Sequence, residues 1–416
     1  MNKENVSTVV KEGLCCSCGV CKSICAKNAI SFNYGKERNT PIVDNQTCVS
    51  CGLCYDICPG KGIELQQLSK KLYSQQDEVE YNQYCGYYLN SYISHSNNED
   101  IRLHSASGGV VTQLLIYLLK TKTIDGALVV RYKEDDPLQP EPFIATTEDE
   151  ILSSRGSKYL VLSFDKVICD LERFEGKIVV VGLPCQIQGI RNLASSKKQI
   201  RNKIIGYFAI YCSLTKTKLS MDYYIWRYGL KKEAIGRFSF RDDGCLGYMK
   251  VENKSGELLK KVKYERYWHG THSFFINDRC TLCVDHFGEL ADISFGDIHI
   301  DPYKKDTVGI SSVITRNRMW NGIIKGCAEA GDIMLQEVSV EDIVKSQPYV
   351  KNRKKGAGVK GYMHIRSLIG KVNPVYDVEN DSKISVKTYI LEIINAVMRR
   401  LGKYRIIWPI VRLLDR

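Results

Sequence analysis

The sequence predicts an α/β protein built from two unlike parts. Residues 1–66 contain two cysteine runs of a kind typical of bacterial ferredoxins that hold two [4Fe–4S] clusters. From residue 101 onward, apolar segments of strand length alternate with segments of helical periodicity, which predicts a largely parallel or mixed sheet. We therefore expect a ferredoxin-like domain at 1–66, a polar linker at 67–100, the α/β domain at 101–350 and a basic extension at 351–416.

The two cysteine runs share the spacing C-x2-C-x2-C-x3-C. The first run is Cys15, Cys18, Cys21 and Cys25, and the second is Cys48, Cys51, Cys54 and Cys58. A cubane cluster needs four converging thiolates, and in two-cluster ferredoxins each run lends its last cysteine to the other cluster. We therefore assign one cluster to Cys15, Cys18, Cys21 and Cys58, and the other to Cys48, Cys51, Cys54 and Cys25. Pro59 follows the second run, whereas Ala26 replaces the usual proline after the first.

Structural zinc and disulfide bonds are the alternatives for these eight cysteines. Four-cysteine zinc sites usually come as two C-x2-C pairs separated by a longer loop, unlike these runs. No secretory signal precedes the first run and no apolar stretch reaches 18 residues, so we expect a reducing cytoplasmic location, in which disulfides are rare. Metal ligation then best explains a total of 17 cysteines.

The α/β domain is expected from a series of apolar segments. Strands are expected at 30–32 and 63–65 in the first unit, and at 125–132, 177–181 and 204–211 in the second. Helices are expected at 110–120 and 186–196, and residues 156–159 are expected to introduce a further helix-like segment. Residues 235–265 are expected to form a β-hairpin that turns at Asn253-Lys254-Ser255-Gly256.

The positive charge is concentrated near the C-terminus. Residues 351–371 carry seven Lys/Arg and no acid, and residues 385–416 carry seven Lys/Arg against two acids, which together account for the whole net charge of +12. The rest of the chain is neutral, which argues against nucleic acid as a partner.

A further set of cysteines is dispersed over the second unit. Cys185 and Cys212 each follow an expected strand, so both would emerge at the carboxyl edge of the sheet, where ligands bind in open α/β folds. Cys280 and Cys283 add a C-x2-C pair, and four thiols from three places would complete a third cluster. Zinc is an alternative for this set, and Cys185 and Cys212 also fit the small buried side chains that free cysteines often are.

Several motifs in residues 81–350 resemble one known family. They are SGG (107–109), GSKY (156–159), GLPCQIQGIRNL (182–193), IYCS (210–213), RCTLC (279–283), GELADISFGDI (288–298) and SSVITR (311–316). In this order they resemble the coenzyme F-420 hydrogenase/dehydrogenase beta-subunit family, in which an N-terminal ferredoxin unit is a common fusion. The resemblance implies an FAD-containing α/β domain and matches Cys185, Cys212, Cys280 and Cys283 to the family's [4Fe–4S] ligands.

The same resemblance implies a set of flavin-binding residues: Ser107, Gly108, Gly109, Gly156, Ser157 and Lys158. Small residues at a helix start let backbone N–H groups approach a pyrophosphate, and a lysine adds a charge-assisted contact. Plain helix capping is the alternative for the Ser-Gly-Gly turn. No G-x-G-x-x-G fingerprint occurs, so a Rossmann-type NAD(P) site is not supported.

The expected activity follows from the cofactors. Clusters carry single electrons, nicotinamides and deazaflavins carry hydride, and a flavin exchanges electrons in both ways. We expect an FAD- and [4Fe–4S]-dependent oxidoreductase whose partner is a redox protein or a small-molecule donor or acceptor. The two-electron partner is coenzyme F-420 or another substrate, since the family includes bacterial members associated with cell-surface polysaccharide synthesis. The alternative is a non-catalytic electron-transfer subunit of a larger redox complex.

The last segment has the pattern of an amphipathic helix. Its apolar stripe consists of Ile390, Ile393, Ile394, Val397, Met398 and Leu401. Two interpretations are open: a basic helix that makes peripheral contact with an anionic membrane face or a partner subunit, or a terminal helix docked on the protein's own core.

Overall fold

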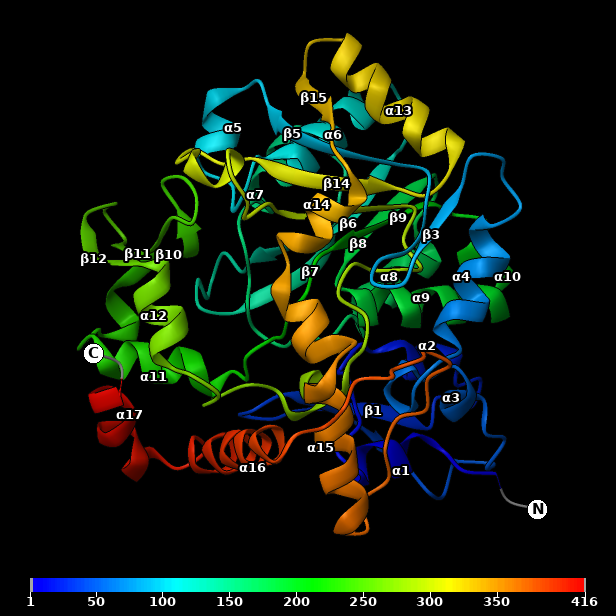
Figure 1. Cartoon of the computed structure of the whole chain (residues 1–416), viewed down its shortest axis with the longest axis vertical. Helices are drawn as coiled ribbons and strands as arrows, with labels where there is room; N and C mark the ends of the chain where they lie inside the picture. The colour runs from blue at the N-terminus through cyan, green and yellow to red at the C-terminus, as the bar shows by residue number, and fades with distance from the viewer. Residues whose placement is uncertain (1–2, 415–416) are drawn as a thin grey trace.

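The central feature of the computed structural model, which describes residues 3–414, is an eight-stranded sheet with the order β15-β5-β14-β13-β9-β8-β6-β7 (Figure 1). Its strands are β5 (Asn90–Ser96), β6 (Gly126–Tyr132), β7 (Pro140–Ala145), β8 (Ile178–Gly182), β9 (Ile204–Ile210), β13 (Ile293–Asp297), β14 (Ser311–Thr315) and β15 (Ile333–Glu337). Neighbours among β6, β8, β9 and β13 pair in parallel, and the other pairs are antiparallel. The sheet is therefore mixed.

Helices cover both faces of this sheet. One face packs on α6 (Val110–Lys120), α7 (Glu148–Ser153) and α13 (Arg318–Glu329), and the other on α8 (Val167–Arg173), α9 (Pro184–Ser196) and α10 (Lys198–Arg201). The strands alternate between the two cores: Val179 faces the first layer and Val180 faces the second. This period of two is expected for strands that are buried on both faces. The smaller helices α5 (Glu99–Leu103) and α14 (Val340–Lys345) flank the sheet.

The N-terminal unit docks on the second helical layer. It contains α1 (Val6–Lys11), α2 (Val20–Ile24), α3 (Leu53–Asp56) and the antiparallel pair β1 (Ile30–Tyr34) and β2 (Asn39–Val43). Its apolar side chains form one continuous core with those of α8 and α9. The strand predicted at 63–65 is wrong: β2 is the partner of β1, and Leu65 begins a helix.

Residues 67–100, predicted as a linker, are instead part of the folded body. Helix α4 (Leu65–Tyr73) and the hairpin of β3 (Glu80–Asn82) and β4 (Gly86–Tyr88) lead directly into β5, which lies between β14 and β15 in the large sheet. The polar composition of this segment misled the prediction, because strand β5 carries Ser91, Ser94 and Ser96 at buried positions. Their hydroxyl groups are satisfied by hydrogen bonds, such as Ser94 Oγ to the Met334 carbonyl at 2.6 Å.

The predicted β-hairpin at 235–265 is a three-stranded sheet. Strands β10 (Ile235–Asp242), β11 (Tyr248–Asn253) and β12 (Leu258–Lys263) are antiparallel, and the predicted turn at 253–256 joins the last two. Helices α11 (Leu219–Arg227) and α12 (Tyr264–Gly270) pack beside it around an aromatic core. Residues 156–159, predicted to introduce a helix-like segment, lie in an extended loop that begins with Gly156 at a φ of 79°, and the next helix, α8, begins at Val167.

The C-terminal region, predicted as a basic extension with an amphipathic helix, packs against the rest of the protein. It contains α15 (Ala357–Leu368), α16 (Val386–Leu401) and α17 (Trp408–Leu414). Lys354, Lys355 and Arg366 are buried, because they bind partners inside the protein. Lys355 Nζ lies 2.6 Å from the buried Glu289 carboxylate, and Arg366 donates to the Glu12 carbonyl at 2.9 Å. Within residues 3–414, no helix is long and apolar enough to cross a membrane.

Candidate metal centres and cofactor site

The two cysteine runs fold into matching loops. Each begins a short helix at a glycine with positive φ, Gly19 at 89° and Gly52 at 81°, two residues after a serine that also has positive φ. The serines are Ser17 at 60° and Ser50 at 51°. Residues with a left-handed backbone conformation at these positions direct successive N–H groups toward one side. Such concave arrangements of N–H groups, called nests, bind anions and Fe–S clusters. The Ser17 N–H donates to Cys15 Sγ at 3.3 Å.

The predicted exchange of the fourth cysteine agrees with the positions of the thiols. Burial raises the pKa of Cys21, and the neighbouring thiols of Cys18, Cys58 and Cys15 raise it further. Burial also raises the pKa of Cys54, next to Cys25, Cys51 and Cys48. Cys58 therefore faces the first run, and Cys25 faces the second. A buried thiol with a raised pKa stays protonated without a metal, so metal binding would release its proton.

The two groups differ in their exposure to solvent. Cys15, Cys18, Cys21 and Cys58 are all buried, whereas in the set of Cys25, Cys48, Cys51 and Cys54 only Cys54 is buried, Cys51 is exposed and the other two are half-buried. We call the first set the inner thiol group and the second set the outer thiol group.

The dispersed cysteines converge as the sequence predicted. Cys185 is the second residue of α9, directly after β8, and Cys212 follows β9. Cys280 lies in the 3-10 turn Asp278–Leu282, and Cys283 follows it. All four thiols line one cavity at the carboxyl edge of the parallel strands. We call this set the third thiol group.

The surroundings of the third thiol group suit negatively charged sulfur. The Thr215 N–H and hydroxyl both lie 3.3 Å from Cys280 Sγ. The buried Lys354 also lines the cavity; burial alone would lower its pKa, but the thiols of Cys283 and Cys212 raise it above its usual value. Such donors and charges stabilise thiolate ligands of a metal. Sequence reasoning did not single out Lys354, because it is one of seven cations in the basic run at 351–371.

Cys16 joins the inner group to the third group. This side chain lines the same cavity as Cys185 and shares a hydrogen bond with it, which lowers the pKa of the Cys16 thiol. The preceding residue, Cys15, belongs to the inner group. In the second run the position of Cys16 is taken by Val49, which is exposed. Cys16 therefore contacts the cavity of the third thiol group, whereas Val49, its counterpart in the second cysteine run, points to solvent.

Helix α9 separates the two groups by about one turn. Cys185 begins the helix, and Gly189 lies four residues later on the same face. A Cβ atom at Gly189 would lie 3.3 Å from Cys18 Sγ, so the helix backbone passes close to the inner group. Arg279 also connects the two groups, because its guanidinium donates to the Pro59 and Gly60 carbonyls at 3.2 and 3.1 Å.

The Ser107–Gly109 turn is held by strands β5 and β14. The Gly108 N–H donates to Ser311 Oγ at 3.0 Å, and a Cβ atom at Gly108 would lie 2.6 Å from the Ser94 carbonyl oxygen. Gly109 has a φ of 75° and caps α6 without a side-chain hydrogen bond. Packing and backbone conformation therefore already require both glycines. These contacts leave both interpretations open, because they do not exclude a flavin nearby.

Gly156 and Lys158 lie on the far side of a buried ion pair from this turn. Arg241 Nη1 lies 2.7 Å from Asp297 Oδ2 at the end of β13. Burial would raise the pKa of Asp297, but Arg241 and, to a smaller extent, the nearby Ser107 hydroxyl lower it below its usual value. The Arg241 carbonyl lies 3.5 Å from the position of a Cβ atom at Gly156. The structure therefore connects the two halves of the predicted flavin set through Arg241 and Asp297, neither of which the sequence had singled out.

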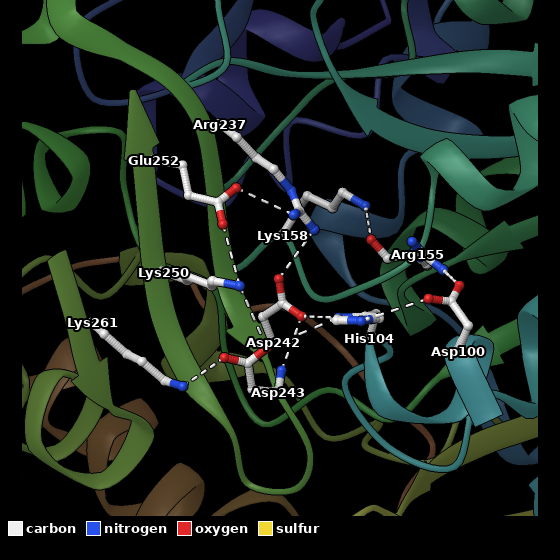
Figure 2. A network of polar contacts seen from close by, with 10 residues as sticks. All are labelled: Asp100, His104, Arg155, Lys158, Arg237, Asp242, Asp243, Lys250, Glu252 and Lys261. Carbon is white, nitrogen blue, oxygen red and sulfur yellow. Dashed lines mark hydrogen bonds and ion pairs between the residues drawn. The ribbon is translucent and has the colours of Figure 1, made fainter. Parts of the chain in front are cut away.

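Lys158 is directed at its own loop. Its ammonium donates to the carbonyls of Arg155 and Gly156 at 2.8 and 3.2 Å, and burial lowers the pKa of Lys158 to about 7. Figure 2 shows this lysine beside a larger polar network that joins the loop to α5 and the three-stranded sheet.

The network contains a cluster of one histidine and two carboxylates. His104, Asp242 and Asp243 lie close enough together to hold a cation. Cationic side chains already neutralise both carboxylates, since Arg237 lies 3.1 Å from Asp242 and Lys261 lies 2.6 Å from Asp243 (Figure 2). The cluster therefore has a structural role: His104, which follows α5, forms a 2.6 Å hydrogen bond through Nδ1 with Asp242 at the end of β10.

Two histidines lie near the sheet edge. His286 is buried beside the third thiol group, where its carbonyl accepts from the Cys212 N–H at 3.0 Å; burial and Lys354 lower the pKa of His286 to about 3. His299 Nε2 lies 3.7 Å from Asp297. His299 is therefore the histidine beside Asp297, which lies between the two halves of the predicted flavin set.

The structure thus describes an α/β protein whose thiol-rich centre lies at the carboxyl edge of a mixed sheet. The chain belongs to the coenzyme F420 hydrogenase/dehydrogenase beta subunit family, whose N-terminal and C-terminal models match residues 91–168 and 175–341. The recognition made from sequence motifs is confirmed at the level of this oxidoreductase family.

Individual relatives share less than a third of their residues with this chain. The coenzyme F420 hydrogenase subunit beta of Methanococcus voltae is 28% identical over 264 residues, which cover 62% of this chain and 87% of that protein. The coenzyme F420-dependent sulfite reductase of Methanocaldococcus jannaschii is 28% identical over 300 residues, 71% of this chain but only 44% of the reductase. The chain thus spans less than half the length of that reductase.

One solved structure shows the same fold. A chain of the F420-reducing [NiFe] hydrogenase complex from Methanosarcina barkeri superposes with a TM-score of 0.54 at 20% identity. The match covers 73% of this chain and 99% of the other.

Proposed function

We propose that this protein is a flavin- and iron–sulfur-dependent oxidoreductase with three [4Fe–4S] clusters and one FAD. The observation that carries the proposal is the convergence of Cys185, Cys212, Cys280 and Cys283 in one cavity, with Cys16 of the first cysteine run beside them. Twelve thiols in three groups of four are a donor set that suits cubane clusters. The N–H donors to Cys15 and Cys280 and the buried Lys354 support the same assignment.

The proposed electron path runs from the outer thiol group to the sheet edge. Cys51 is exposed, so a redox partner protein has access to the outer cluster. The inner group is buried and leads, through Cys15 and Cys16, to the third group. Cys185 is the proposed ligand of the third cluster, and Cys16 lies beside it in the same cavity.

The flavin site is proposed above the ends of β13 and β14. Ser107, Gly108, Gly109, Gly156, Ser157 and Lys158 would surround it, with Arg241 and Asp297 between the two halves. Bound FAD would supply the exchange between single electrons and hydride. Gln347 lies next to the proposed site, since its amide donates to the Asp297 carbonyl at 2.8 Å.

The two-electron partner is proposed to be coenzyme F420 or a substrate of another kind. Relatives named as F420 hydrogenase and F420-dependent sulfite reductase proteins favour the deazaflavin. An enzyme of cell-surface polysaccharide synthesis in a reducing cytoplasm is the alternative for the same cofactors. A non-catalytic electron-transfer subunit is the alternative class, and the fold shared with a chain of a hydrogenase complex is the observation that favours it.

Reductive titration of protein purified without oxygen tests the proposal. Clusters would be reduced with limiting dithionite, and oxidised coenzyme F420 would be added while the visible spectrum is recorded. Reduction of the deazaflavin by the isolated chain, in an amount that matches the electrons lost from its clusters, supports the oxidoreductase. Reoxidation of the clusters only when a partner protein is added supports the relay subunit. Protein that lacks visible absorption and releases no flavin on denaturation contradicts both.

A further inference from the structure

Helix α16 docks on the protein through its polar side. Its only two buried residues are charged, Glu392 and Arg399. Arg353 donates to the Glu392 carboxylate at 3.0 Å, and Arg399 donates to Asp278 at 3.0 Å. Asn395, on the same side, accepts from Ser273 at 2.6 Å. These bonds fix the rotation of the helix about its axis.

The apolar stripe of α16 consequently faces outward. Five of its six members, Ile390, Ile393, Ile394, Val397 and Leu401, are exposed over 38% (Leu401) to 53% (Ile390) of their surface, and Val386 on the same side is exposed over 75%. The sixth member, Met398, lies at the edge of the stripe and packs on the aromatic core. A helix at the surface of a globular protein normally turns this stripe toward the core. Of the two interpretations of this helix, the structure therefore disfavours the one in which the apolar stripe docks on the protein's own core.

Neighbouring segments extend the stripe into a larger surface. Leu368 and Ile369 at the end of α15 are exposed, as are Ile406, Ile410 and Leu413 around α17. Figure 1 shows α16, α17 and the lower end of α15 along the same end of the molecule. We call these five residues, together with Val386, Ile390, Ile393, Ile394, Val397 and Leu401, the apolar C-terminal surface. Contiguous exposed apolar residues on this scale mark an interaction site.

Cations accompany this surface. The exposed charged residues from 383 to 414 are Lys383, Lys387, Arg400, Lys403, Arg405 and Arg412. The single acid in this range, Glu392, is buried in its ion pair. On the helical wheel Lys387 and Arg400 lie on opposite sides of the apolar stripe. Long cationic side chains in such positions reach the headgroup level while the stripe enters the acyl boundary.

We propose that the apolar C-terminal surface binds the face of an anionic lipid bilayer. A second copy of this chain would bring the same cations against one another, so charge disfavours self-association through this surface. Anionic headgroups complement the cations, and the acyl region covers the apolar stripe. The proposal does not depend on the redox function, because no thiol or flavin residue takes part in it.

Vesicle flotation of the anaerobically purified full-length protein tests the proposal. The probes are vesicles of phosphatidylcholine alone and vesicles with about one third phosphatidylglycerol. We expect at least tenfold more protein to float with the anionic vesicles, and less as salt is raised, because salt screens the cations. Equal flotation with both vesicles, or none with either, overturns the proposal.

Point variants locate the contact better than truncation, because Arg399 and Trp408 anchor this region in the core. Ile393→Asn combined with Val397→Asn changes exposed side chains only, and we expect at least a tenfold loss of flotation. The matched control is Met319→Asn with Leu103→Asn, two exposed apolar residues on α13 and α5 at the opposite end of the molecule. The control should float like the unchanged protein.

Analytical ultracentrifugation tests whether a second copy of the chain, instead of lipid, covers this surface. If the protein is a dimer that Ile393→Asn with Val397→Asn converts to a monomer, the surface belongs to a second copy and the lipid proposal is wrong. If Lys387→Gln with Arg400→Gln leaves anionic flotation unchanged, the charge argument fails and the proposal is also overturned. Circular dichroism checks that each variant keeps its helical content.

Discussion

The third thiol group and the Ser107–Gly109 turn were both expected to hold a cofactor, but only the thiol group lacks another structural role. The thiols come from three separate segments and meet in one cavity, where no disulfide joins them. The glycines of the turn already have structural roles. Gly108 lies where β5 and β14 leave no room for a Cβ atom, and Gly109 caps α6 in the left-handed conformation.

The difference lies in what each residue type does without a cofactor. The half-buried thiols of the third group contribute little to packing that a small apolar side chain would not, so their convergence points to a metal. Glycines serve tight packing and positive φ wherever the backbone needs them, so their clustering is a weak indication of a phosphate site. The metal centres therefore rest on geometry, whereas the flavin site rests mainly on family membership. The predictions below probe this contrast.

Replacement of Cys280 with alanine should have the largest effect. We expect the iron content to fall from about twelve to about eight ions per chain, because the third cluster loses a ligand. Iron and acid-labile sulfide measurements check this. Cys327→Ala is the matched control, since Cys327 is buried on α13 against the opposite face of the sheet. An unchanged iron content in Cys280→Ala would contradict a cluster in this cavity.

Lys158→Met should lower flavin content several-fold while leaving iron unchanged. The reason is the loss of a buried cation from the loop that would face the cofactor. Flavin released on denaturation is the measurement, and Lys120→Met, at an exposed lysine, is the control. Full flavin content in Lys158→Met would favour plain structural roles for this loop.

Lys354→Met should lower the midpoint potential of the third cluster. A reduced cluster carries one more negative charge, and a buried ammonium nearby stabilises it. Removing that ammonium should shift the potential by roughly 50–100 mV, taking about 2 kcal/mol for a charge pair at intermediate dielectric. Potentiometric titration followed by EPR measures the shift. Lys351→Met, an exposed site in the same segment, should leave the potential unchanged.

The smallest effect is expected for glycine-to-alanine changes in two helices. Gly189→Ala places a Cβ atom 3.3 Å from Cys18 Sγ and 3.2 Å from Val20, so we expect about 1 kcal/mol of destabilisation and a changed EPR signal of the inner cluster. Gly322→Ala in α13 meets no atom within 4 Å and should stabilise the protein by about 0.5–1 kcal/mol. Anaerobic thermal unfolding compares the two, and stabilisation by both would argue that α9 is not close to the inner group.

Sequence reasoning succeeded where the periodicity or spacing was strong. The apolar runs at 125–132, 177–181 and 204–211 became β6, β8 and β9, and this placed Cys185 and Cys212 at one edge. It failed at 67–100, because β5 buries serine side chains that hydrogen bonds satisfy, and a polar strand does not stand out from a linker.

Tertiary contacts that reverse a local pattern were beyond prediction. The stripe of α16 indicated a helix but not the side that docks, which Glu392 and Arg399 decide through partners more than 35 residues away along the chain. Lys354 likewise looked like one charge in a basic run, and only the fold places it against the third thiol group.

The most direct test of the central claim is the iron and acid-labile sulfide content of the unchanged protein, purified without oxygen, with flavin measured on the same sample. Three thiol groups and one flavin site predict about twelve iron, about twelve sulfide and about one FAD per chain. About eight iron ions would contradict the third cluster. Zinc in place of iron, with no sulfide and no flavin, would contradict the account as a whole.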